Sequence, residues 1–121
     1  IQSDVIRKLA AEGSCIFVGR CADYVMKDDR DCLNLFISAD MHDRIRRISA
    51  SHKITEGKAK DMIERTDKGR SGYYKYFSGK TWGAAESYHL CINSSLLGID
   101  ETVRLISQVA ELRFSLTRGN D

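Results

Sequence analysis

The pattern of apolar and polar positions along the chain predicts helices of several turns. Over residues 3–12 the apolar side chains recur three or four positions apart, which is the period of a single helix face. A second helix is predicted to begin at Asp40 and a third at Thr55, because both residue types are good helix caps. The third helix is expected to end near Arg70, and a further helix covers residues 100–114.

Short, largely apolar runs predict strands between these helices. They are residues 15–18, 33–37 and 88–93. Such runs are typical of parallel strands that are covered on both faces. Strands that alternate with helices predict an α/β fold with a parallel sheet and right-handed crossovers. Three strands are few for such a sheet, so we expect strands upstream of Ile1 to complete it, with this chain as the later part of a longer protein.

The composition is that of an ordinary folded protein and excludes a membrane-spanning one. The 121 residues are 42% hydrophobic and 30% charged, and no apolar run approaches the roughly 20 residues that a membrane span needs. The four cysteines form no CxxC pair, and no histidine stands at zinc spacing from them. We interpret them as reduced thiols packed as small core residues, Cys15 and Cys91 within apolar runs, in a cytoplasmic protein.

Positive charge is concentrated in one region. Between Arg44 and Lys80, 11 Lys and Arg residues stand against 4 Asp and Glu residues, a local charge of +7, whereas the whole chain carries only +2. A region of this kind is suited to anions. Residues 44–80 are therefore predicted to meet a negatively charged partner.

The stretch DKGRSGYYKYFSGKTWG, residues 67–83, concentrates aromatic and basic side chains. Its rings are Tyr73, Tyr74, Tyr76, Phe77 and Trp82. Their spacing fits neither a clean helix period nor strand alternation. Tyrosine and tryptophan tolerate half-exposed positions, so such rings either fasten a mobile flap to the body of the protein or stack on a base. The simpler alternative is that they cover the edge of the sheet.

Chemistry in a parallel α/β sheet is expected at the carboxyl ends of the strands. The candidate residues follow these ends or lie on the adjoining helices: Arg20, Asp23, Arg44, Arg47, Asp67 and Arg70. Arginine grips phosphate through its planar fork. Arg44 and Arg47 are three residues apart and share a helix face, as do Asp67 and Arg70. The alternative is ordinary surface pairing, with Asp40 or Asp43 as partners of the first two arginines.

Several motifs of catalytic or metal sites are absent from the 121 residues. The histidines match no metal or triad pattern, and no residue is a convincing ligand for a metal ion. The sequence also contains no GxxxxGKS or GxxxxGKT phosphate loop.

Four segments, taken in order, resemble the cytidylate kinase-like family, a branch of the P-loop nucleoside monophosphate kinases. They are FVGRCADYVM, NLFISADMHDRIRRI, AKDMIERTDKGRSGYYKYFSGKTWG and YHLCINSSLLGIDETVRLI. The resemblance runs from about residue 16 to 106 and is most specific in the Asp-x-x-Arg followed by paired tyrosines and Trp-Gly. It implies a three-layer α/β/α fold with a five-stranded parallel sheet. Residues 1–121 would be the C-terminal part of one domain, with a basic lid at about residues 44–80 and the phosphate loop upstream of Ile1.

The resemblance also implies a function, the transfer of the γ-phosphate of ATP to a nucleoside monophosphate with Mg²⁺ as cofactor. Arg20 matches an arginine that contacts the acceptor monophosphate, with Asp23 beside it. Asp67 and Arg70 match a pair near the acceptor sugar and phosphate. The start of the lid, Arg44 and Arg47, matches arginines that reach the donor phosphates.

Two positions depart from the classical cytidylate kinases, which carry aspartate directly before and after the Gly-Arg pair. Here these positions are Val18 and Cys21. These two departures leave the identity of the acceptor base undecided, and a pyrimidine nucleoside monophosphate is the first expectation.

Two other functions remain as alternatives. A nucleic-acid-binding module would use the same basic and aromatic region. A regulatory or assembly domain would keep the fold without catalysis. The expected partners are small nucleotides and not membranes. Nucleic acid is the less favoured partner. The sequence does not decide between a monomer and a homodimer.

Overall fold

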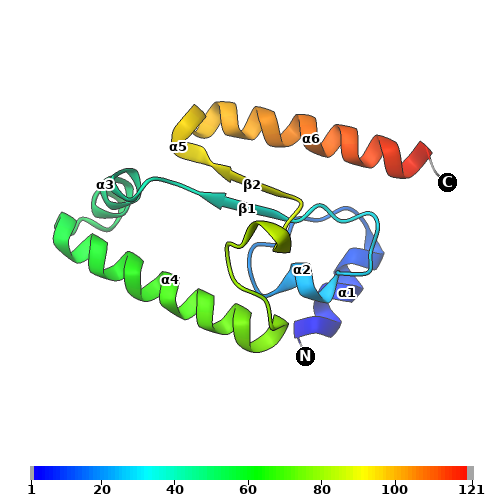
Figure 1. Cartoon of the computed structure of the whole chain (residues 1–121), viewed down its shortest axis with the longest axis horizontal. Coiled ribbons are helices and arrows are strands. Elements are labelled where there is room, and N and C mark those ends of the chain that lie inside the picture. Colours follow the sequence, from blue (N-terminus) through cyan, green and yellow to red (C-terminus); the bar gives the residue numbers. More distant parts are fainter. Residues whose placement is uncertain (1, 120–121) are drawn as a thin grey trace.

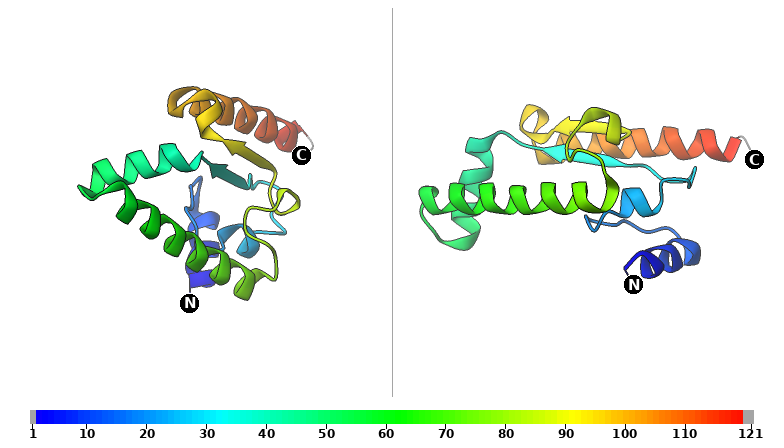
Figure 2. Two further views of the ribbon diagram at one scale, coloured as in Figure 1. Left: turned by 60° about the vertical axis from the view of Figure 1, so that its left-hand side comes forward. Right: turned by 60° about the horizontal axis from the view of Figure 1, so that its bottom comes forward.

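The computed structural model describes residues 2–119, and Ile1, Asn120 and Asp121 lie outside the described part. Helices predominate, and two short strands form a small sheet (Figure 1). The elements in chain order are α1 Gln2–Glu12, α2 Ala22–Val25, β1 Leu35–Ser38, α3 Met41–His52, α4 Glu56–Ser78, a 3₁₀ turn at Ala85–Ser87, β2 Leu90–Asn93, α5 Ser94–Leu97 and α6 Ile99–Gly119. In Figure 1 and in the left view of Figure 2, the strands lie between α6 and α4.

The two strands pair in parallel, as the apolar runs predicted. Leu35 stands opposite Leu90, and Ser38 stands opposite Asn93. Each strand begins two residues later than the run that predicted it. The described part of the chain thus contains a two-stranded sheet, where the sequence predicted three strands here and five in the whole fold.

The strand predicted at residues 15–18 is wrong for the described structure. These residues form no ladder with another segment, and Ile16 and Val18 are 92% and 90% exposed. An apolar run becomes a strand only when a neighbouring strand pairs with its backbone and covers its side chains. The described residues supply neither.

Helices α3 and α4 pack against each other and begin at the predicted caps. Asp40 precedes α3, and Thr55 precedes α4 and accepts a hydrogen bond from the Lys58 N–H at 3.2 Å. Ala59 and Ile63 of α4 are buried. The right view of Figure 2 shows the two helices crossing rather than running side by side.

Helix α4 is longer than predicted and takes in most of the aromatic stretch. It runs to Ser78 and ends at Gly79, whose φ of 73° is readily adopted only by glycine. The rings of Tyr73 and Phe77, four residues apart, lie on one face with centroids 4.5 Å apart. Tyr74 faces another way and is buried. The aromatic residues therefore occupy two faces of one helix, which hid its period in the sequence.

A chain of rings seats the end of the stretch against the sheet. Phe36 of β1 lies 5.1 Å from Trp82 and 5.1 Å from Tyr88, centroid to centroid, and Tyr88 stacks on Tyr74 at 6.1 Å. Gly83 has a φ of 82°, and a Cβ there would stand 3.2 Å from the Phe36 ring, so the turn favours glycine. Of the five rings in the stretch, Trp82 packs on β1 through Phe36, and Tyr74 is joined to Phe36 through Tyr88.

The cysteine prediction is wrong for two residues. Cys15 and Cys91 are exposed, whereas Cys21 is the buried thiol, and all four cysteines are free. Cys91 lies on a strand with one open face, and Cys15 lies in the unpaired run. Within residues 2–119, no helix has the length and apolar character needed to cross a membrane.

Candidate functional site

A cavity of about 280 Å³ lies between α3 and α4. Its lining residues are Arg44, Arg47, Ile48, His52, Met62, Ile63, Thr66, Asp67 and Arg70. The structure thus brings together four of the six predicted site residues, two from each helix. Arg44 and Arg47 are on adjoining positions of the α3 face, and Asp67 and Arg70 are on adjoining positions of the α4 face.

Arg44 and Asp67 join the two helices through a two-point ion pair. One terminal nitrogen of Arg44 lies 2.8 Å from Oδ1 of Asp67, and the other lies 2.8 Å from Oδ2. The hydrogen bond that Arg44 donates to Asp67 raises the pKa of the Arg44 guanidinium above its usual value. The alternative partners expected for Arg44 were Asp40 and Asp43, and neither forms the pair.

Arg47 and Arg70 line the same cavity and form no ion pair with a carboxylate of the described residues, although the charge of Arg47 helps to lower the pKa of Asp43. Asp67 is the acidic residue of the lining, and it is engaged by Arg44. The cavity therefore carries an excess of positive charge, with two guanidinium groups free to bind an anion. Such groups suit phosphate because their N–H donors form a planar fork.

Arg20 and Asp23 lie outside this cavity. Arg20 is exposed and belongs to a turn of three consecutive left-handed residues, with φ of 72° at Gly19, 60° at Arg20 and 54° at Cys21. The turn leads into α2, and Asp23 accepts a hydrogen bond from the Tyr74 hydroxyl at 2.5 Å. The prediction that Arg20 projects from the end of a paired strand is wrong for the described residues, because residues 15–18 are not a strand.

Helix α4 connects the cavity to this turn. Asp67, Arg70 and Tyr74 follow each other at intervals of three and four residues, so they lie along one face of the helix. Asp67 engages α3 at one end of this stripe, and Tyr74 engages α2 at the other. Tyr74 is seven positions after Asp67, which corresponds to a rise of about 10.5 Å along the helix axis. Sequence reasoning missed Tyr74 as part of this stripe, although its spacing from Asp67 was a usable signal.

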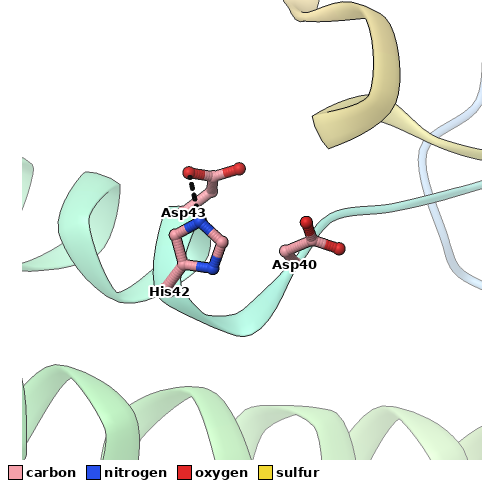
Figure 3. A group of neighbouring side chains, drawn as sticks. All are labelled: Asp40, His42 and Asp43. Atoms are coloured by element: carbon pink, nitrogen blue, oxygen red, sulfur yellow. Dashed lines mark ion pairs between the residues drawn. The ribbon is translucent and has the colours of Figure 1, made fainter.

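One group of candidate metal ligands occurs within residues 2–119, at the start of α3: Asp40, His42 and Asp43 (Figure 3). Figure 3 shows His42 turned toward Asp43, with 3.4 Å between Nε2 and Oδ1. Both carboxylates have other partners. Asn93 donates to Asp40 at 2.9 Å, and a hydrogen bond from Ser95 lowers the pKa of Asp43.

These residues do not fit a Mg²⁺ site. Carboxylates at a helix N-terminus interact favourably with the partial positive charge of the helix dipole, and the same charge repels a cation. None of the three lines the arginine cavity. The group instead fastens the start of α3 to α5, where the Ser95 hydroxyl accepts from the Asp40 N–H at 2.8 Å. No described residue is therefore assigned to a metal ion.

Comparison with known proteins identifies a family and similar solved structures. The model of the cytidylate kinase-like family matches residues 1–96. The crystal structure of an uncharacterized protein from Eubacterium ventriosum is similar with a TM-score of 0.88 and 27% sequence identity, over 91% of this chain. The chain spans 63% of the length of that structure. No curated protein matches the chain.

Proposed function

The chain belongs to the cytidylate kinase-like family, and on this premise we propose that it is part of a phosphotransferase. The enzyme moves the γ-phosphate of ATP to a nucleoside monophosphate, with a pyrimidine nucleotide as the first expected acceptor. The observation that carries the proposal is the cavity between α3 and α4, where Arg44, Arg47 and Arg70 converge.

The chemistry of phosphoryl transfer explains why converging arginines matter. The transferred group carries its charge on three equatorial oxygens, so catalysis depends on positioning and on neutralising that charge. Arg47 and Arg70 supply cationic donors, and neither is held in an ion pair among the described residues. Arg44 uses two of its N–H groups on Asp67, which holds its guanidinium plane in place and leaves its other donors for a phosphate oxygen.

We assign α3 and α4 to a lid over the donor phosphates, in agreement with the local charge of +7 between Arg44 and Lys80. The ring chain from Tyr74 to Trp82 fastens the end of this lid to β1. A fastened lid that closes on its substrates excludes water, and exclusion of water prevents hydrolysis of ATP. The lid proposal therefore gives a purpose to both the basic and the aromatic residues.

We assign Arg20 to the acceptor. Its guanidinium is exposed on a turn outside the cavity, with no carboxylate partner among the described residues. An arginine there is placed to meet a second phosphate, separate from the donor phosphates at the cavity. Asp67 and Arg70 would meet the acceptor from the side of α4.

The proposal requires parts that these 121 residues do not contain. It places the chain in a three-layer P-loop kinase fold whose glycine-rich loop is supplied by sequence upstream of Ile1. ATP is the proposed phosphate donor. The Mg²⁺ that accompanies ATP is given no step here, because the described carboxylates do not fit it.

The test is a transfer assay with the native protein. Labelled γ-phosphate on ATP is offered with CMP, dCMP, UMP, AMP or GMP, one acceptor at a time. We expect a labelled nucleoside diphosphate from at least one pyrimidine nucleotide. A folded protein that labels none of the five acceptors contradicts the proposal and favours a regulatory domain of the same fold.

An exposed group of rings supports nucleic-acid binding as a second candidate. Tyr76 is 83% exposed, and it lies against Phe77, which also contacts Tyr73. Rings of this kind on a basic helix stack on the bases of single strands. This candidate predicts binding to single-stranded RNA or DNA that weakens steeply with salt and is not competed by mononucleotides.

A further inference from the structure

The turn that carries Arg20 has an unfavourable backbone. Gly19, Arg20 and Cys21 all have positive φ, and the latter two are residues with a Cβ. Left-handed conformations crowd the Cβ against the backbone, so they persist only when surrounding contacts enforce them. Strained turns of this kind gather at binding sites, and the contacts that enforce this one are therefore of interest.

Local contacts hold the shape of the turn. The Ala22 N–H donates to the Gly19 carbonyl at 3.2 Å, and the Cys21 carbonyl accepts from Val25 at 3.1 Å. The side chains of Cys21 and Ala22 are buried. The two hydrogen bonds stay within the turn and α2, and α2 packs against α1, so neither contact joins the turn directly to α4.

The hydrogen bond between Tyr74 and Asp23 joins the turn and α2 directly to α4. Its 2.5 Å separation is typical of a hydroxyl that donates to a carboxylate. Tyr74 is only 5% exposed, and its ring stacks on Tyr88. Burial, followed by the nearby Asp23, raises the pKa of the Tyr74 hydroxyl, so it stays protonated and remains a donor.

We propose that Tyr74 is a positioning residue for acceptor binding. Its hydroxyl holds Asp23 and thereby places the turn that carries Arg20 against α4. Arg70 lies one turn away on the same face of α4. The hydroxyl thereby sets the spacing between Arg20 and Arg70, the two guanidinium groups assigned to the acceptor. This inference rests on the proposed function for its catalytic consequence, and on geometry alone for the placement of the turn.

A purely structural role for Tyr74 makes a different prediction. Its ring packs on Tyr88 and so supports the core, and a large truncation would unfold the protein whatever the hydroxyl does. Tyr74→Phe keeps the ring and removes only the hydroxyl, which bonds Asp23 and also interacts with Tyr88. Tyr73→Phe is the matched control, because its hydroxyl donates at 3.3 Å to Gln2 of α1 and does not contact Asp23.

The experiment uses the native protein and two measurements on each variant. Hydrogen exchange reports the backbone amides of residues 19–25, and steady-state kinetics report KM for the acceptor and for ATP. Loss of one hydrogen bond to a charged group corresponds to about a tenfold change in binding. For Tyr74→Phe we expect faster exchange over residues 19–25 and an acceptor KM raised about tenfold, with KM for ATP and kcat changed less than twofold.

Each outcome decides the inference. Unchanged exchange in Tyr74→Phe overturns it, whether or not the protein is active. Faster exchange with equal rises in both KM values also overturns it, because the effect would then be a general loosening of the fold. An inactive wild-type protein refutes the proposed function separately, and the exchange measurement still decides whether the hydroxyl places the turn. A double-mutant cycle tests whether Tyr74 acts through Asp23. Adding Asp23→Ala to Tyr74→Phe should raise the acceptor KM little further, and additive effects of the two substitutions would contradict the inference.

Discussion

Arg44 of α3 and Asp67 of α4 meet through both terminal nitrogens and both carboxylate oxygens, at 2.8 Å in each contact. Their side chains are 29% and 24% exposed, so the pair is partly withdrawn from water. The two residues are 23 positions apart in the sequence. The pair therefore fixes the geometry between the two helices that line the cavity.

Replacement of Asp67 should destabilise the protein. Asp67→Asn leaves Arg44 partly buried without its counter-charge, and we expect the free energy of unfolding to fall by about 1–2 kcal/mol. Urea denaturation measures the change. Asp61→Asn on the same helix is the control, because Asp61 is exposed and its side chain forms no ion pair with another described residue. Equal effects of the two substitutions would contradict a structural role for the pair.

Arg70 should matter for catalysis and little for folding. Arg70→Ala removes a cationic donor from the cavity, and we expect kcat/KM to fall by roughly 10²-fold or more. Arg65→Ala is the matched control, because Arg65 is exposed on α4 and does not line the cavity. Steady-state kinetics and a thermal unfolding scan on both variants check the prediction. An unchanged kcat/KM in Arg70→Ala would mean that its assigned role is wrong.

Arg20 should affect the acceptor selectively. Arg20→Ala removes one charge-assisted contact to the acceptor phosphate, and we expect KM for the acceptor to rise by about 10-fold or more while KM for ATP stays near its original value. Initial rates measured with each substrate varied in turn separate the two constants. Arg30→Ala tests whether any exposed arginine gives the same result. A larger effect on ATP than on the acceptor would reverse the assignment.

The buried Tyr74 hydroxyl predicts a loss of stability in alkali. Because the folded state raises its pKa above the ordinary value of 10.0, the unfolded state releases the proton first as the pH rises. This contribution to stability is fully present below about pH 10 and declines above it. Urea midpoints measured between pH 8 and pH 11 should fall more steeply in the wild type than in Tyr74→Phe. Parallel curves would show that the hydroxyl is not coupled to folding.

The sequence predicted the elements whose signals are local. The starts of α3 and α4 and the two paired strands were found because their signals depend on neighbouring residues. Of the two predicted caps, Thr55 forms the capping hydrogen bond with its side chain, and Asp40 does not. Asp67 and Arg70 were expected to share a pocket for the same reason, since residues three apart on a helix face one way. The cavity includes both of them.

The errors concern features that depend on distant residues. The run at residues 15–18 has the composition of a strand, but no described neighbour pairs with it. Helix α4 was ended too early because Gly69, Gly72 and rings on two faces obscured its period. The bond between Tyr74 and Asp23 joins residues 51 positions apart, and no pattern along the chain announces it.

The central claim is that the cavity between α3 and α4 receives the phosphates of ATP. The most direct test is an NMR titration of the arginine Nε–H groups of the native protein with ATP. The account predicts that Arg44 and Arg47 shift together and saturate with one dissociation constant, while Arg46 and Arg65 stay unchanged. Shifts that do not saturate, or that are equal in all four arginines, would contradict it.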